Sequence, residues 1–324
     1  MMPHGIPEIN DGNGLWPEQT SPVEKLQNEL FDKYGLEVFI KRDDLLLPYG
    51  GNKWRKLKYN FLEMVDKGHR EFLSFGGAFS NHIYASATLA ERYGLRAIIL
   101  VRGSVDDLEN PVLRHARACG VKLVSMDRKS YANRYSIEFT NELKVKYPSA
   151  YIIPEGAANQ NGLKGCSEIV DETIQQIGKR PDYWILGAGT GNTAAGIASR
   201  LKVNERVIAV AALRFAIMKD AFQSSLLLIP ESLRRVISVT EEYNFGGMAK
   251  WDDQLVTFIR NFERSNKILL DPIYTGKAMY ALFDLVAKGN FERGSSIVFV
   301  HTGGMPGRMS FNYRYGDLLV DPDH

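Results

Sequence analysis

A lysine at the start of a predicted helix is the first residue of this sequence that could carry out chemistry. Lys53 follows Tyr49–Asn52 (YGGN), whose composition is typical of a turn, and precedes apolar residues at helical spacing over 54–65. Glycines allow a bulky ligand to approach the backbone, and a cation at a helix N-terminus is unfavourable unless an anion lies nearby. Taken alone, however, the segment is more typical of a solvated basic helix face, because further cations follow within residues 55–58.

A glycine-rich stretch, Gly187–Gly196 (GAGTGNTAAG), could bind a phosphate group. It directly follows a predicted strand over 183–186 and opens a predicted helix. Backbone N–H groups converge in such a turn, and a helix N-terminus favours an anion. The same letters fit a dinucleotide fingerprint through Gly189 and Gly191, but the next predicted strand is followed by Arg214 and not by an acidic residue. This argues against NAD and leaves an NADP-linked oxidoreductase open as an alternative.

Two further strand ends carry polar residues. SFGGAFSNH ends a predicted strand with two glycines and places Ser80 and Asn81 at the start of a predicted helix. In HTGG, Thr302 follows a predicted strand over 296–301. Ser80 is also typical of an ordinary N-cap, so neither stretch is specific alone. The histidines show no ligand spacing with carboxylates, so we expect no metal site.

The elements that must position these residues alternate between strand and helix. Strands that are apolar on both faces require helices on both sides of a parallel sheet. We therefore expect an α/β fold with two doubly wound parallel-sheet domains, in which ligands bind at the carboxyl ends of the strands. The smaller domain is placed at 56–165, inserted in a larger domain made of 1–55 plus 166–324. Helices are expected at about 22–34, 54–67, 80–93, 110–119, 134–147, 162–177, 193–201, 252–265 and 277–288.

Composition excludes several classes of protein. The chain has 324 residues, 44% of them hydrophobic, with a formal charge of +2, which is ordinary for a globular protein of two domains. There is no basic run interleaved with aromatic residues and no apolar run of transmembrane length. The N-terminal stretch lacks the pattern of a signal peptide, and Cys119 and Cys166 are expected to be free thiols. We expect a cytoplasmic protein without nucleic-acid or membrane partners.

A lysine together with a phosphate cradle is the minimal equipment for pyridoxal phosphate, because the lysine forms a Schiff base and the cradle anchors the phosphate. Here the sequence resembles the pyridoxal-phosphate enzymes of the tryptophan synthase β-like fold (fold type II), in particular the 1-aminocyclopropane-1-carboxylate (ACC) deaminase and D-cysteine desulfhydrase family. The matching stretches stand in the family's order: KRDDLLLPYGGNKWRKL (41–57), SFGGAFSNH (74–82), GAGTGNTAAG (187–196), LDPIYTGKAMYAL (270–282) and VHTGGMPG (300–307).

The resemblance implies roles for the matching residues. Lys53 would hold the cofactor and later move a proton, Ser80 would be a nucleophile or proton relay, and Tyr274 would act near cofactor and substrate. Asn81 would bond the ring oxygen beside the Schiff base, and Thr302 would meet the pyridine nitrogen. The phosphate would be bound by Gly189, Thr190, Gly191, Asn192 and Thr193. The substrate would contact Ser80, Asn81, His82 and Tyr274.

Two departures from the family bear on the substrate. ACC deaminases usually carry Glu after the tyrosine that matches Tyr274, where this sequence has Thr275. A carboxylate keeps the pyridine nitrogen protonated and the ring a strong electron sink, whereas a hydroxyl makes it a weaker one. Thr275 therefore favours β-elimination of a good leaving group over cyclopropane ring opening. Met248 stands roughly where relatives carry a substrate-facing tyrosine, so we expect the pocket to differ from those of both known activities.

The resemblance thus implies a homodimeric lyase or deaminase that converts a small amino acid to a 2-oxo acid and ammonia. It leaves open which amino acid and which enantiomer is used. Besides the NADP-linked oxidoreductase, a family member that binds the cofactor without turnover is an alternative.

Overall fold

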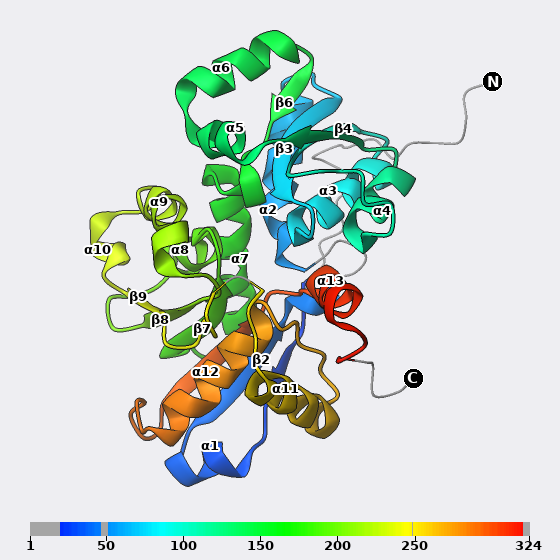
Figure 1. Ribbon diagram of the computed structural model, residues 1–324. Coiled ribbons are helices and arrows are strands. Elements are labelled where there is room, and N and C mark those ends of the chain that lie inside the picture. Colours follow the sequence, from blue (N-terminus) through cyan, green and yellow to red (C-terminus); the bar gives the residue numbers. More distant parts are fainter. Residues whose placement is uncertain (1–19, 47–50, 248, 320–324) are drawn as a thin grey trace, which may run out of the picture.

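The computed structural model describes residues 20–46, 51–247 and 249–319. These residues form two parallel sheets, one of six strands and one of four, each covered by helices (Figure 1). The predicted α/β fold with two doubly wound parallel sheets is thereby confirmed. No helix within the described ranges is long and apolar enough to cross a membrane.

The larger sheet has the strand order β1-β2-β10-β7-β8-β9, and only the edge strand β1 is antiparallel to its neighbour. The chain winds from β7 outward to β9 and then returns as β10 on the other side of β7, so the winding direction switches between β7 and β10. The bounds are β1 Val23–Lys25, β2 Glu37–Arg42, β7 Tyr183–Ala188, β8 Arg206–Ala211, β9 Ile237–Thr240 and β10 Ser296–His301. Ligands of doubly wound sheets bind at such switch points.

The smaller sheet repeats this logic in the order β5-β4-β3-β6, with every pair parallel. Its winding direction switches between β3 and β6. The bounds are β3 Glu71–Gly77, β4 Arg96–Arg102, β5 Lys122–Met126 and β6 Ala150–Ile152. The apolar runs predicted as strands, such as RAIILV, are buried on both faces because helices cover both sides.

Two long helices, α2 and α7, join the sheets and pack against each other between them (Figure 1). Gly165 on α7 permits this close approach, since a Cβ there would lie 1.8 Å from the carbonyl oxygen of Arg55. Lys58 Nζ donates to Glu168 across the same contact at 2.9 Å. The predicted domain boundaries, 55/56 and 165/166, fall inside these two helices, and the division stays a prediction. The bounds are α2 Asn52–Asp66 and α7 Gln160–Ile177.

The remaining helices cover the outer faces. On the smaller sheet they are α3 Asn81–Arg92, α4 Pro111–Ala118, α5 Arg128–Ala132 and α6 Ile137–Lys146. On the larger sheet they are α1 Glu29–Tyr34, α8 Asn192–Ala198, α9 Phe215–Leu226, α10 Glu231–Arg234, α11 Asp253–Asn266 and α12 Thr275–Ala287, whereas α13 Met305–Tyr315 packs against α3 and α4.

Two predicted helices differ from the structure. The helix expected at about 22–34 begins only at Glu29, because Asn28 caps it, and Val23–Lys25 pairs instead with β2 as an edge strand. The helix expected at 134–147 is broken at Ser136, whose backbone is extended and whose hydroxyl accepts from Phe139 N at 3.2 Å. In both cases a capping side chain fixes the helix start, as such residues commonly do.

Candidate active site

The switch points of the two sheets enclose one pocket of about 410 Å³. Every strand end that the sequence singled out contributes to it. Of the predicted site residues, those that line the pocket are Lys53, Ser80, Asn81, His82, Gly189, Thr190, Gly191, Thr193, Tyr274 and Thr302. Asn192 is the exception: it is buried, and its Nδ2 donates to Asn159 O at 3.1 Å, away from the pocket. Met248 lies outside the described residues.

Lys53 enters the pocket from the first turn of α2. Its position depends on Gly51, which has φ +68° and where a Cβ would lie 2.5 Å from the carbonyl oxygen of Thr302. Only glycine fits this turn, which brings the start of α2 against the end of β10. Burial lowers the pKa of the Lys53 amine to about 7, and the charge of Lys56 adds to this effect. At neutral pH the amine therefore exists in both protonation states.

Lys56 was assigned to a solvated face by sequence, but it is buried and lines the same pocket. Its ammonium forms no ion pair with a carboxylate of the described residues, and burial lowers its pKa. Arg55 is buried as well, on the opposite side of α2, where Asp43 and Glu172 bind its guanidinium. Periodicity could not show this, because it is the packing of α7 that buries these cations.

The glycine turn after β7 forms the pocket wall opposite. Gly191 has φ +77°, and a Cβ there would lie 2.5 Å from the ring of Phe222. Ser225 Oγ donates to Thr190 O at 2.8 Å and fixes the turn from behind. The turn ends in the first residues of α8, where the N–H groups at 192–194 precede the first intrahelical bond, from Ala195 N to Gly191 O. Such a turn can bind a phosphate.

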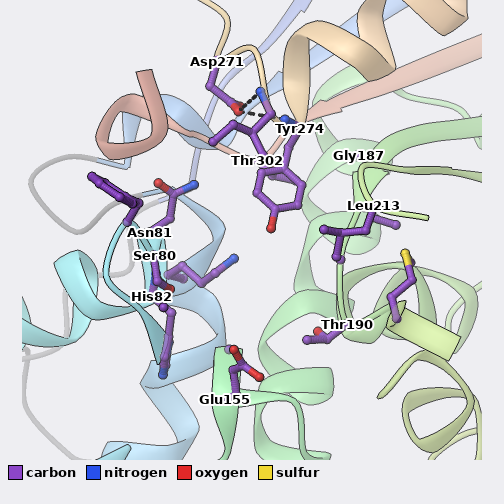
Figure 2. Close-up of a pocket in the computed structure, with 18 of the residues that line it drawn as sticks. Ser80, Asn81, His82, Glu155, Gly187, Thr190, Leu213, Asp271, Tyr274 and Thr302 are labelled. Atoms are coloured by element: carbon purple, nitrogen blue, oxygen red, sulfur yellow. Dashed lines mark hydrogen bonds between the residues drawn. The ribbon is translucent and has the colours of Figure 1, made fainter. Parts of the chain in front are cut away.

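Ser80 and Asn81 lie on the smaller-sheet side, as Figure 2 shows. Ser80 is the N-cap of α3, and its Oγ accepts from His82 N at 3.1 Å. The Oδ1 atom of Asn81 is buried without a partner among the described residues. His82 points away, because its Nε2 bonds Ser74 Oγ at 2.8 Å, and burial lowers the pKa of its ring to about 3. Ser80 and Asn81 thus offer polar groups to a ligand, whereas the His82 ring is neutral and bonded to Ser74.

Tyr274 reaches down into the pocket from the larger-sheet side (Figure 2). The carboxylate of Asp271 fixes its backbone, accepting from Ile273 N and Tyr274 N at 2.8 Å each. The second oxygen of Asp271 accepts from Thr275 N at 3.0 Å and from Thr275 Oγ1 at 2.7 Å. Burial raises the pKa of Tyr274 to about 12, so its hydroxyl stays protonated at neutral pH.

Thr302, and not Thr275, presents a hydroxyl to the pocket. The Thr275 side chain is buried, and it donates to Asp271 while accepting from Asp271 N at 2.8 Å. Thr302 lines the pocket, and its hydroxyl has no hydrogen-bond partner within the described ranges. The neighbouring His301 bonds Leu269 O at 2.7 Å and packs behind the strand end.

Five more charged residues of the pocket escaped the sequence analysis: Asp271, Glu155, Arg102, Arg134 and Arg314. Glu155 follows β6, and its carboxylate accepts from Tyr131 OH at 2.9 Å and from Arg134 Nε at 2.6 Å. Asp271 and Glu155 both raise the pKa of Tyr274, and Arg102 opposes them. Asp271 lies inside the matching stretch 270–282, which does not by itself show that this residue faces the pocket, and no local motif marks the others.

A buried lysine on α12 holds the backbone of residues 244–247. Lys277 Nζ donates to Asn244 O and Gly247 O at 2.8 Å each and to Ala212 O at 3.3 Å. Ala249, just beyond, lines the pocket. Residues 244–247 are thus tied to the residue that follows β8, and Ala249 borders the ligand space.

The pocket fits a phosphorylated aldehyde cofactor. It combines a lysine amine with a pKa near 7, a glycine turn at a helix start, and the buried ammonium of Lys56 without a carboxylate partner. The orphaned buried oxygen of Asn81 marks a position where a ligand can complete a hydrogen bond. Fold and pocket together define an enzyme of the pyridoxal-phosphate-dependent class built on two doubly wound sheets.

Comparison with known proteins supports the assignment to the pyridoxal-phosphate-dependent class. The chain belongs to the pyridoxal-phosphate dependent enzyme family, whose sequence pattern matches residues 17–303. It is 34% identical over 314 residues to a putative ACC deaminase of Pyrococcus horikoshii, covering 94% of each chain. It is 27% identical to a D-cysteine desulfhydrase of Yersinia enterocolitica, covering 90% of this chain and 93% of the relative. A solved ACC deaminase homologue superposes with a TM-score of 0.76 at 32% identity over 93% of both chains.

Proposed function

We propose that this chain uses pyridoxal phosphate to release ammonia and a 2-oxo acid from a small amino acid by β-elimination. The observation that carries the proposal is the Lys53 amine, which lies in one pocket with the glycine turn and has a pKa near 7. The printed names of the relatives, ACC deaminase and D-cysteine desulfhydrase, support the substrate class. Membership in the pyridoxal-phosphate family removes the reason for an NADP-linked oxidoreductase.

In this proposal, different residues of the pocket wall bind different parts of the cofactor. Lys53 binds it covalently, and Lys56 and the turn at 189–193 bind its phosphate. Asn81 bonds the ring oxygen and Thr302 faces the ring nitrogen. When bound, pyridoxal phosphate withdraws electrons from the α-carbon of an amino acid and so acidifies its proton.

Lys53 is the proton carrier in this scheme. A base is most effective when its pKa lies near the working pH, since it must both accept and return a proton. Lys53 meets this condition because burial and the charge of Lys56 lower its pKa to about 7. Ser80 assists on the opposite side: its oxygen accepts from His82 N, which leaves its own proton free to be donated into the pocket.

The proposed substrate carries a leaving group on its β-carbon. Its carboxylate binds at the start of α3 through Ser80 and Asn81, where the helix N-terminus favours an anion. Tyr274, protonated at neutral pH, donates a hydrogen bond to the leaving group. Where ACC deaminases usually carry Glu this chain has Thr275, so the ring lacks that carboxylate and is a weaker electron sink. A cysteine- or serine-like amino acid suits this sink better than ACC.

The homodimer that the resemblance implies and the cytoplasmic location expected from the composition are part of this proposal. The family relationship supports the dimer. Sedimentation equilibrium of the purified chain tests the dimer directly.

The test is a turnover assay on a panel of both enantiomers of cysteine and serine together with ACC, reading ammonia and 2-oxo acid. We expect release from at least one cysteine or serine enantiomer, faster than from ACC. Lys53→Ala should abolish it, whereas Lys58→Ala, on the same helix but bound to Glu168, should not. A loaded protein that turns over no member of the panel would instead favour the alternative of cofactor binding without turnover.

A further inference from the structure

Asn52 connects three parts of the site that lie far apart in the sequence. Its Oδ1 accepts from Lys53 Nζ at 3.0 Å, and its Nδ2 donates to Thr193 Oγ1 at 3.0 Å. Its backbone N–H donates to Thr302 O at 3.1 Å. The side chain is 4% exposed, so these bonds form where water is largely excluded. One amide thus bonds the lysine, the glycine turn and the end of β10.

The orientation of this amide follows from its partners. An ammonium has only donors, so the atom that faces Lys53 has to be the oxygen. The nitrogen then faces Thr193, whose hydroxyl accepts its proton and keeps its own proton for another acceptor. A reversed amide would set an N–H group against the donors of the Lys53 ammonium and leave that N–H unpaired, while the Thr193 hydroxyl would turn to donate to the oxygen. Burying such an unpaired group is unfavourable.

Asn52 Oδ1 is the hydrogen-bond acceptor that the described residues provide for the Lys53 amine. Other ionisable groups act on Lys53 only through space: Lys56 on α2, Cys166 on α7, Asp271 before α12 and His82 on α3. None of these points the amine in a direction. A lysine side chain has many rotamers, and holding it in one of them requires a fixed partner.

We propose that Asn52 is a positioning residue. Its amide aims the Lys53 amine into the pocket and, through Thr193, fixes the position of that amine relative to the phosphate-binding turn. The inference rests on the proposed function, in which Lys53 condenses with the cofactor aldehyde. In that step the neutral amine attacks the carbonyl carbon, a C=N bond forms and one water molecule leaves. A correctly aimed amine raises the rate of such a step without changing its chemistry.

The test measures the rate of condensation against pH, using the cofactor-free protein and visible absorbance. Only the neutral amine reacts, so the midpoint of the rate profile reports the pKa of Lys53. Asn52→Ala removes an acceptor from the ammonium and should lower both the midpoint and the maximal rate. Asn52→Asp places a carboxylate there and should move the midpoint to higher pH. A hydrogen bond to a charged group corresponds to a shift of about one pH unit or more.

Variants of Thr193 provide a second experiment, which distinguishes positioning of the Lys53 amine from binding of the phosphate. Pyridoxal lacks the phosphate, so a residue that serves only the phosphate has no influence on its condensation. We expect Thr193→Val to slow condensation with pyridoxal about tenfold, because the Asn52 amide loses its anchor, and Thr193→Ser to restore it. Asn60→Ala is the matched control: Asn60 is a buried asparagine of the same helix that bonds Asn159, and its loss should leave the midpoint unchanged.

Several results would overturn the inference. One is that the pH midpoint of condensation is equal in wild type, Asn52→Ala and Asn52→Asp. Another is that the Thr193→Val variant condenses with pyridoxal at the wild-type rate. A purely structural role would lower melting temperatures in both Asn52 variants without moving the midpoints in opposite directions. If wild type fails to condense with pyridoxal phosphate at Lys53, the proposed function fails, and this inference fails with it.

Discussion

Replacing Gly187 with alanine should damage the site through Tyr274. Gly187 lies in β7 directly beneath the backbone of Tyr274. A Cβ at this position would lie 2.7 Å from Tyr274 O, 2.9 Å from its carbonyl carbon and 3.1 Å from its Cα. Ordinary contact begins at 3.4 Å, so the Tyr274 backbone has to move by about 0.7 Å if β7 stays in place. It cannot move freely, because Asp271 binds the N–H groups on either side of it.

The size of this displacement determines how much folding free energy and how much kcat/KM we expect the variant to lose. Overpacking of this kind costs about 1–3 kcal/mol of folding free energy. A catalytic group misplaced by roughly 1 Å can cost about 100-fold in rate, so 0.7 Å should cost about 10- to 100-fold in kcat/KM. The assays are thermal unfolding and steady-state turnover of whichever substrate the panel identifies.

Gly68→Ala is the matched control. Gly68 has φ +78° and open space around it, so alanine there costs about 1 kcal/mol of backbone strain and touches nothing. It should lower stability and leave kcat/KM unchanged. In the double variant with Tyr274→Phe, the activity losses of Gly187→Ala should not add, because both act on one residue. Full additivity, or unchanged turnover in Gly187→Ala, would refute this reasoning.

Three further predictions concern charged groups that line the pocket or lie behind it. Lys53 has a pKa near 7 in the fold and 10.5 when unfolded, so the unfolded chain binds the extra proton between these values. The cofactor-free protein should therefore gain stability from pH 7 toward pH 10, and urea titrations of Lys53→Met should lack that contribution. Asp43→Ala should destabilise the fold by about 3 kcal/mol in the same assay, because it removes a carboxylate from the buried Arg55. Lys56→Ala should weaken pyridoxal phosphate binding about tenfold or more in an equilibrium titration, since it removes a charged partner of the phosphate.

The sequence predicted those parts of the site that local chemistry defines. Lys53 and the turn at Gly189–Thr193 both stand where glycines meet a helix start, and such a turn is recognisable in one segment. The two parallel, helix-covered sheets follow from the alternation of apolar strands and helices. Thr302 lines the pocket because the carboxyl ends of parallel strands share one edge of a sheet.

The parts that were missed depend on contacts between distant segments. Lys56 was read as a surface cation because helical periodicity does not show that α7 covers that face of α2. Glu155 follows no motif and Asp271 was given no role within its matching stretch, because only the meeting of the two sheets brings them to one pocket. Asn192 sits within the predicted phosphate turn, yet its side chain turns toward Asn159. A residue at the start of a helix can face either way, and the sequence of one segment does not say which.

The pairing of β2 with β10 also has a consequence for biosynthesis. Glu37 in β2 pairs with Ser296 in β10. β2 therefore lacks its partner β10 until almost the whole chain has left the ribosome. The smaller sheet uses only residues 71–152 and can close much earlier. The nascent chain therefore carries β2, whose middle residues 38–40 are apolar, with one edge unpaired through most of its synthesis. Contacts of such long sequence separation fold slowly and expose the chain to aggregation, which makes chaperone dependence during translation an expected property of this fold.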